Sequence, residues 1–180
     1  GGRLISETFS IDDLGGAEWV REMTPELNSI KNLRVMTRTT VFGAYDHGAY
    51  GAIERTTNQN SSDVGRPRQV FWKIYSKRAI LCSGATERAI AFGNNDRPGV
   101  MLASAVRTYV NRWGVTPGKQ VAIFTNNDDG WRTAADLSSK GIKITAIVDT
   151  RNSPQQTVVS DTNIITNGRI VDTHGRLGIR

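Results

Sequence analysis

The sequence predicts an α/β protein in which an antiparallel β-meander and a further extended strand precede a Rossmann-like βαβ unit. Between residues 33 and 55, apolar side chains recur at every second position, and Asp46-His47-Gly48 supplies a turn between two strands. After residue 115, two short apolar runs flank a segment with helical spacing. Such a strand–helix–strand order is typical of parallel strands joined by a right-handed crossover.

The first half of the chain is expected to begin with a helix and to continue as strands. Ser10-Ile11-Asp12-Asp13 offers side chains that cap a helix N-terminus, and apolar residues then repeat at helical spacing until Pro25 interrupts them. The other elements predicted here are a polar loop over residues 56–68 and three strands over residues 50–55, 70–75 and 78–82.

Helices and strands alternate in the second half. Val106, Val110 and Trp113 repeat at i, i+4 and i+7, which predicts a helix over residues 101–113 that Gly114 ends. The remaining predicted elements are strands over residues 120–124 and 142–148, a helix over residues 130–140 between them, a short helix over residues 153–161, and hairpin strands at residues 164–165 and 169–171.

The composition of the chain argues against several classes of protein. The formal net charge is +6, but no run of five Lys or Arg exists and acidic residues lie among the basic ones, so we do not expect a nucleic-acid partner. The single cysteine, Cys82, excludes an internal disulfide, and its apolar surroundings predict a small buried side chain.

His47 and His174 lie in turns and are not spaced like metal ligands, so no metal site is expected. The apolar runs are too short to span a bilayer and no secretory segment is present, which predicts a cytoplasmic protein.

The loop that opens the helix of the βαβ unit is where a dinucleotide's phosphates would bind. The dinucleotide fingerprint has Gly-x-Gly-x-x-Gly there, so that the pyrophosphate reaches the helix N-terminus. This chain has Phe124-Thr125-Asn126-Asn127-Asp128-Asp129-Gly130 instead, with side chains at two of the glycine positions and two carboxylates at the helix end. Such carboxylates cap the helix and repel phosphate. Asp149 ends the second strand, where an acidic residue would bind a ribose hydroxyl, yet we interpret the unit as structural.

A second candidate region lies between the two halves of the chain. A strand that stops at Ser83-Gly84-Ala85 lets a nucleotide approach the backbone closely, because glycine has no Cβ. The cluster Asn94-Asn95-Asp96-Arg97 follows, and two interpretations of it stay open. In the first interpretation, Arg97 pairs with a phosphate and one of the asparagines binds the cofactor. In the second, the cluster is a turn before the next helix, with Pro98 at a rigid corner.

No catalytic residue is predicted. Glu87-Arg88 is interpreted as a local surface pair. Asp12-Asp13 and Asp128-Asp129 are each adjacent in sequence, so neither is a facing acid pair, and both are interpreted as helix caps.

The run Arg97-Pro98-Gly99-Val100-Met101-Leu102-Ala103-Ser104-Ala105-Val106-Arg107 resembles the alpha subunit of heterotetrameric sarcosine oxidase. The resemblance extends from Gly1-Gly2-Arg3-Leu4 to Asp149-Thr150-Arg151, and the strand before Ser83-Gly84-Ala85 resembles the second dinucleotide-contact strand of two-dinucleotide-binding-domain flavoproteins. It implies a partial glutathione-reductase-like dinucleotide-binding fold. Residues 1–114 would be part of an FAD/NAD-binding domain that lacks its first phosphate loop, and residues 115–180 part of an inserted NAD-binding-like domain.

The resemblance also implies a function. In that family, an oxidoreductase with beta, gamma and delta subunits demethylates sarcosine oxidatively to glycine, hydrogen peroxide and a one-carbon unit carried by tetrahydrofolate. The alpha subunit holds a non-catalytic NAD, while FAD and FMN perform the redox chemistry in the whole complex. By resemblance, Gly1, Gly2 and Arg3 would lie by the ribose or pyrophosphate, Thr40 and Val41 by the adenine, and Ser83, Gly84 and Ala85 by the phosphates.

Other interpretations stay open. The chain starts without Met, so we expect a piece of a longer protein that is itself inactive; alternatively, Gly1-Gly2 is a cloning scar. The whole enzyme is a sarcosine oxidase or another flavin amine dehydrogenase, such as an opine oxidase or hydrogen-cyanide synthase. A third alternative is a docking module that binds no nucleotide.

Overall fold

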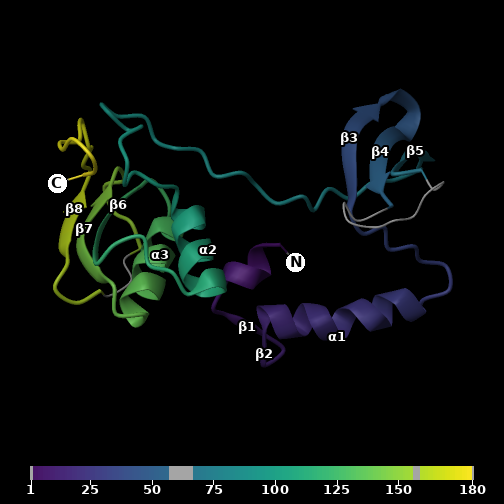
Figure 1. Ribbon diagram of the computed structural model, residues 1–180, viewed down its shortest axis with the longest axis horizontal. Helices are drawn as coiled ribbons and strands as arrows, with labels where there is room; N and C mark the ends of the chain where they lie inside the picture. Colours follow the sequence, from purple (N-terminus) through teal and green to yellow (C-terminus); the bar gives the residue numbers. More distant parts are fainter. Residues whose placement is uncertain (1, 57–66, 156–158, 180) are drawn as a thin grey trace. The chain divides into compact units, whose positions relative to one another are not determined.

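The structure is a computed structural model that describes residues 2–56, 67–155 and 159–179 (Figure 1). The chain divides into two compact units, one made of Gly1–Arg21 with Thr86–Arg180 and the other of Glu22–Ala85. Most of the loop predicted over residues 56–68 and the middle of the short helix predicted over residues 153–161 lie outside the described residues. The predicted domain boundary at residue 114 stays a prediction.

The Glu22–Ala85 unit contains the predicted β-meander. Its strands β3 (Thr39–Tyr45), β4 (Ala49–Arg55) and β5 (Gln69–Tyr75) form one antiparallel sheet in that order. Between β3 and β4, the 3-10 turn η2 (Asp46–Gly48) reverses the chain, as the sequence predicts. Gly48 is required in this turn, because its φ is +70° and a Cβ would lie 2.3 Å from the carbonyl oxygen of Ser76.

Side chains of the meander pair across its strands. Trp72 donates its indole N–H to Glu54 Oε2 at 2.8 Å, and the Arg34 guanidinium lies 4.3 Å from the centroid of the Trp72 ring. On the other face, the rings of Phe42 and Phe71 have centroids 5.8 Å apart. The strand register shifts between Val41 and Gly43, at the position of Phe42. The Phe42 ring packs against Gly51 so closely that a Cβ there would lie 2.6 Å from it.

The predicted contact strand over residues 78–82 is wrong, because residues 78–92 have no regular secondary structure. Ile80 and Leu81 are 90% and 89% exposed, and Cys82 is exposed instead of buried. A strand is stabilised by hydrogen bonds to a neighbouring strand, and none of the described strands pairs with this run. Its apolar sequence alone does not make it a strand.

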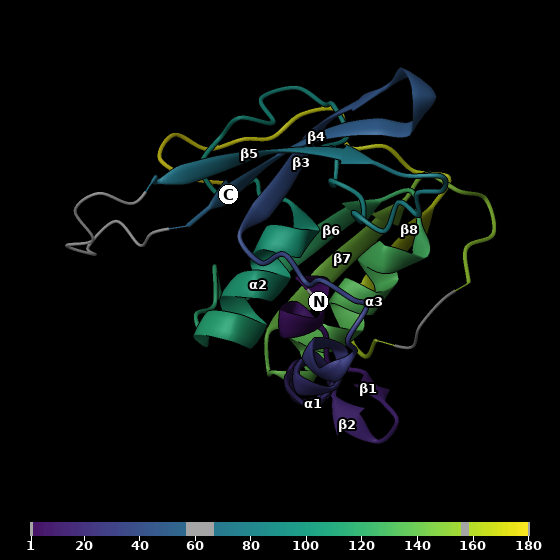
Figure 2. The ribbon, with the colours of Figure 1, turned by 90° about the vertical axis from the view of Figure 1, so that its right-hand side faces the viewer.

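The other unit contains the predicted βαβ unit. Strand β6 (Gln120–Thr125), helix α3 (Asp128–Ser139) and strand β7 (Lys143–Asp149) follow each other, and β6 and β7 are parallel as predicted. Strand β8 (Asn163–Thr166) extends the sheet to the order β6-β7-β8 (Figure 2). It is parallel to β7, so the predicted terminal hairpin is wrong, and residues 169–171 form no strand.

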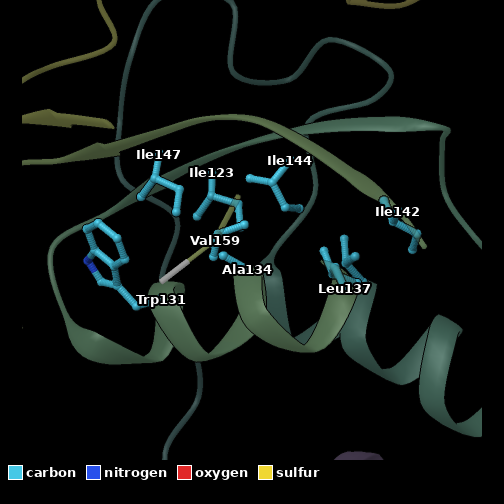
Figure 3. Packing of buried hydrophobic residues seen from close by; sticks show 9 residues of the cluster. Ile123, Trp131, Ala134, Leu137, Ile142, Ile144, Ile147 and Val159 are labelled. Carbon is cyan, nitrogen blue, oxygen red and sulfur yellow. The ribbon is translucent and has the colours of Figure 1, made fainter. Parts of the chain in front are cut away.

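The core of this unit lies between α3 and the sheet. Trp131, Ala134 and Leu137 project from one face of α3 at helical spacing (Figure 3). They pack against Ile123, Ile144 and Ile147 of the parallel strands. Helix α2 (Ala103–Trp113) contributes Val106 to this core and ends at Gly114, whose φ of +63° is the left-handed helix cap that the sequence predicts.

The N-terminal segment differs from the sequence-based expectation. It forms a 3-10 turn η1 (Arg3–Ser6) and the two-residue strands β1 (Ser10–Ile11) and β2 (Leu14–Gly15) before helix α1 (Gly16–Ser29). Asp12 and Asp13 have φ of 51° and 64° and form the turn between β1 and β2, so they are not helix caps. Helix α1 continues through Pro25, which removes a single backbone donor. No described helix has the length and apolar character needed to cross a membrane.

Candidate functional site

The loop between β6 and α3 keeps one element of the dinucleotide fingerprint. Thr125 and Asn127 stand at its first two glycine positions, and Gly130 stands at the third. A Cβ on Gly130 would lie 2.3 Å from Thr125 Oγ1, so only glycine lets α3 approach β6 this closely. The close packing of helix on strand is therefore present.

The phosphate-binding element of this loop is replaced by side chains. Asn127 is the N-cap of α3, and its Oδ1 accepts a hydrogen bond from the backbone N–H of Asp129 at 3.0 Å. The Thr125 hydroxyl accepts from the Asn127 N–H at 3.2 Å. These backbone donors are the groups that a phosphate would use. With Asp128 and Asp129 adding negative charge in the first turn, the N-terminus of α3 is a poor anion site.

Asp149 is also engaged within the unit. Its side chain is fully buried and accepts hydrogen bonds from Trp131 Nε1 at 2.7 Å and from Arg151 Nη2 and backbone N–H at 2.8 and 2.9 Å. Arg151 donates in addition to Asp128 Oδ1 at 2.7 Å. Burial opposes ionisation of Asp149, but the hydrogen bonds from Arg151 and Trp131 outweigh it and lower the pKa of this carboxyl below its ordinary value. The carboxylate thus ties β7 to α3, in support of the structural interpretation.

A buried ionic cluster joins η1, α2 and α3, and sequence reasoning missed it. Arg107 is 5% exposed; its Nη2 donates to Glu7 Oε2 at 2.7 Å and its Nε to Asp136 Oδ2 at 3.3 Å. Asn111 donates to the same Asp136 oxygen at 2.6 Å. Arg3 pairs with Glu7 and with Asp129. Burial opposes ionisation of Glu7, but Arg3 and Arg107 prevail and lower the pKa of its carboxyl.

The residues predicted to contact a dinucleotide are divided between the two units. Gly1 lies outside the described residues, and Gly2 has open space around it. Thr40 and Val41 are neighbours on β3, so their side chains leave the sheet on opposite faces. Ser83, Gly84 and Ala85 are all exposed.

Gly84 has the backbone that the predicted turn requires. Its φ is +74°, in the left-handed region that glycine adopts without strain. In the part of the chain that the structure describes, no atom lies within 4 Å of the position that a Cβ would take. Glycine is therefore favoured at this position by its backbone conformation and not by crowding from described residues.

The Asn94–Arg97 cluster packs against the C-terminal segment. Asn94 Nδ2 donates to Asp172 Oδ1 at 2.6 Å, and the Thr173 hydroxyl donates to the Asn94 carbonyl at 2.9 Å. The hydrogen bonds from Asn94 and from the Thr173 N–H lower the pKa of Asp172. Asn94 thus supports the interpretation as a turn. Arg97 differs, because its Nε is buried and has no hydrogen-bond partner among the described residues.

Glu87 is not the surface partner of Arg88 that the sequence suggested. Its two carboxylate oxygens accept hydrogen bonds from the backbone N–H groups of Ala103 at 3.0 Å and Ser104 at 2.7 Å. Glu87 therefore caps the N-terminus of α2 from a position 16 residues earlier in the chain. Local capping patterns carry no signal for such a distant partner.

No family model matches the chain, but curated proteins do. It is 45% identical over 152 residues to sarcosine oxidase subunit alpha of Rhizobium meliloti (strain 1021), covering 84% of this chain and 15% of that protein. The chain is homologous to a segment of sarcosine oxidase alpha subunits. It is also 36% identical over 169 residues to sarcosine oxidase subunit alpha of Corynebacterium sp. (strain U-96), covering 91% of this chain. It spans only 15–17% of the length of these relatives.

A solved structure has a similar fold. The crystal structure of L-proline dehydrogenase from P. horikoshii superposes on 83% of this chain and 28% of its own with a TM-score of 0.56 and 20% identity. At this identity, the similarity concerns the fold alone. It confirms the predicted class, a mixed α/β dinucleotide-binding fold with a meander and a parallel sheet, although without the predicted contact strand.

Proposed function

We propose that the chain is part of the alpha subunit of a sarcosine-oxidase-type flavoenzyme and contributes non-catalytic dinucleotide binding and subunit docking. The observation that carries the proposal is the 36–45% identity to sarcosine oxidase alpha subunits over most of the chain. The whole enzyme would oxidise sarcosine to glycine with peroxide and a folate-borne one-carbon product, in the cytoplasm. Its other components would be beta, gamma and delta subunits, FAD and FMN.

The segment itself is proposed to be inactive. Its most buried carboxylates, Asp136 and Asp149, are tied to arginine side chains and are therefore engaged in structure rather than available to a substrate. Among the described residues, no group of His, Cys, Asp and Glu side chains is arranged to hold a metal ion.

The dinucleotide is proposed to be NAD, bound at the Gly84 turn rather than at the βαβ unit. Gly84 supplies an open backbone with positive φ, which suits a phosphate because a phosphate accepts hydrogen bonds from backbone N–H groups. In the other unit, Arg97 has a buried guanidinium nitrogen without a partner among the described residues, and it is proposed as a cofactor-binding residue on its own account. Thr40, Val41, Gly2 and Arg3 are proposed for the adenosine and pyrophosphate; Arg3 would first have to leave its ion pair with Asp129.

The test is Gly84→Val in the complete enzyme, with Gly141→Val as the matched control. Both glycines have similar φ, +74° and +79°, and open space at the Cβ position, so both variants carry a similar backbone strain of about 1–2 kcal/mol. We expect Gly84→Val to release the alpha-bound NAD, measured after denaturation by chromatography, while Gly141→Val retains it. Full NAD content in Gly84→Val contradicts the site assignment. Sarcosine turnover by the unmodified complex, compared with opine turnover and cyanide formation, tests the reaction.

A further inference from the structure

Glu87 is the first residue after an unsupported stretch of chain that is bonded to another element. In the part of the chain that the structure describes, residues 77–86 make no hydrogen bond or ion pair, and residues 81–86 are exposed. Glu87 is half-buried, and its Oε1 and Oε2 accept hydrogen bonds from the backbone N–H groups of Ala103 and Ser104 at 3.0 and 2.7 Å. The packed part of this segment therefore begins at the Glu87 side chain.

The chain stays fixed after Glu87. The Phe92 ring packs edge-on against Phe124 of β6 with the ring centroids 5.8 Å apart, and the Gly93 N–H donates to the Val171 carbonyl at 2.8 Å. Glu87 thus forms the boundary between an exposed stretch that carries the Gly84 turn and a packed stretch that leads to α2.

The cap on α2 is made by a distant residue, although a local one would suffice. Leu102 occupies the N-cap position with φ of −66° and ψ of 140°, the extended backbone of a capping residue, but its side chain makes no capping hydrogen bond. Ser, Asp or Asn at this position would satisfy helix N–H groups without ordering any other segment. A cap from 16 residues away instead requires the intervening chain to be ordered, which costs conformational entropy. Its additional effect is to hold residue 87 in place.

The cap restrains the Gly84 turn through the chain. Gly84 precedes Glu87 by three residues, and an extended chain advances at most about 3.6 Å per residue, so the two Cα atoms lie within about 11 Å of each other. Among the described residues, no hydrogen bond restrains the turn itself. A ligand loses affinity for a segment in proportion to the time that the segment spends in other arrangements. Ordering by Glu87 therefore favours binding at Gly84.

We propose that Glu87 is a positioning residue for dinucleotide binding: its carboxylate, bound to the N-terminus of α2, restrains the Gly84 turn in the arrangement that binds NAD. Glu87 acts through the chain and not by contact with NAD. The inference rests on the proposed function, because it takes the Gly84 turn as the binding element. It adds the residue that orders this element.

A local helix cap separates positioning from capping. Leu102→Asn supplies the N-cap side chain that α2 lacks, and it is compared in the complete enzyme with the double variant Leu102→Asn, Glu87→Ala. Both proteins carry the local cap and differ only at residue 87. We expect the dissociation constant for NAD, titrated into enzyme freed of dinucleotide, to be roughly 10-fold higher in the double variant. Equal dissociation constants overturn the proposal, because Glu87 would then act on α2 alone.

Asn127→Ala is the control for a general loss of stability. Asn127 caps α3 as Glu87 caps α2, since its Oδ1 accepts from the Asp129 N–H, but it is not connected to the Gly84 turn. We expect Glu87→Ala and Asn127→Ala to lower the melting temperature of the enzyme alike, and only Glu87→Ala to weaken NAD binding. Equal weakening by the two variants contradicts a positioning role.

Trypsin cleavage after Arg88 tests the restraint without NAD. Arg88 is exposed and follows Glu87 directly, and a protease cuts a chain segment when the segment opens locally. We expect the complete enzyme to be cleaved there roughly 5-fold faster in the double variant than in Leu102→Asn. Equal cleavage rates overturn the proposal. If the unmodified enzyme binds no NAD, the dinucleotide assignment fails, and the trypsin comparison alone decides whether Glu87 holds the segment.

Discussion

The N-terminus of α3 and the Gly84 turn differ in what already occupies them. At α3, Asn127 accepts from the helix N–H of Asp129, and Arg3 and Arg151 pair with the flanking carboxylates Asp129 and Asp128. At Gly84, no atom of the described residues lies within 4 Å of an added Cβ. Both regions belong to a dinucleotide-type fold, yet only the second is open. The comparison teaches that close packing of a helix on a strand does not by itself leave the helix N-terminus open to a ligand.

The largest expected effect is a loss of stability on disrupting the buried ionic cluster around Arg107. Arg107→Met leaves Glu7 and Asp136 buried without their shared cation, and we expect the free energy of unfolding to fall by about 3–5 kcal/mol. Urea unfolding followed by tryptophan fluorescence measures the change. Arg112→Met, at the exposed arginine of the same helix, is the control and should change stability little. Equal stability of the two variants would show that Arg107 does not organise the cluster.

The next largest effect is expected at Gly130, which stands at the third glycine position of the dinucleotide fingerprint. Gly130→Ala places a methyl group 2.3 Å from Thr125 Oγ1, so α3 must shift away from β6. We expect a loss of about 1–3 kcal/mol in the free energy of unfolding. Gly118→Ala is the control, because its added Cβ has only the Gln120 carbonyl nearby, at 3.6 Å. A Gly130→Ala variant as stable as the control would refute the close packing of α3 on β6.

A smaller effect concerns the pH dependence of the closed region. The pKa values of Asp149 and Glu7 are lowered in the folded protein, so their contribution to stability is present above the ordinary carboxyl pKa of about 4 and is lost as the pH falls through the folded values. Asp149→Asn should flatten the decline in stability below about pH 5. Urea midpoints between pH 3 and 7 measure it, with the remaining slope arising partly from Glu7. An unchanged slope would mean that Asp149 titrates as in the unfolded chain.

The smallest expected effect is weak anion binding at the N-terminus of α3 once the side chains that occupy it are removed. Asn127→Gly combined with Asp129→Ser frees the helix N–H and removes one carboxylate, and it also releases Arg3. We expect pyrophosphate to bind this variant weakly, with a dissociation constant of roughly 1–10 mM, because a helix N-terminus attracts anions. Amide chemical shifts of Gly130 during titration report binding, and Asn127→Gly alone is the control. If neither variant responds, Asn127 and Asp129 are not what closes the site.

Elements that carry their own local signal were predictable from the sequence. The meander turn at Asp46-His47-Gly48, the cap at Gly114 and the parallel strands β6 and β7 follow from glycine positions and from the periodicity of apolar residues. The closure of the α3 N-terminus was also visible, because the residues that replace the glycines, Thr125 and Asn127, lie in one short loop of the sequence. These features depend on neighbours within a few residues.

Features that depend on distant partners were not predictable. Glu7 and Arg107 are 100 residues apart, and Glu87 reaches the N-terminus of α2 across 16 residues, so no spacing rule links them. Residues 78–82 show the opposite failure, because an apolar run predicted a strand and a buried Cys82 although no described strand pairs with it. A strand depends on its neighbour as much as on its own sequence.

The exposed run from Ala79 to Cys82 has a practical consequence for the protein in solution. It is uncharged and free of proline, and its Ile80 and Leu81 side chains are 90% and 89% exposed, so it offers apolar surface to other chains. Cys82 ends this run with an accessible thiol that air oxidation can convert into a bridge between two chains. Aggregation of the purified chain should therefore begin here, and a charged residue at Ile80 together with a reducing buffer is the direct remedy.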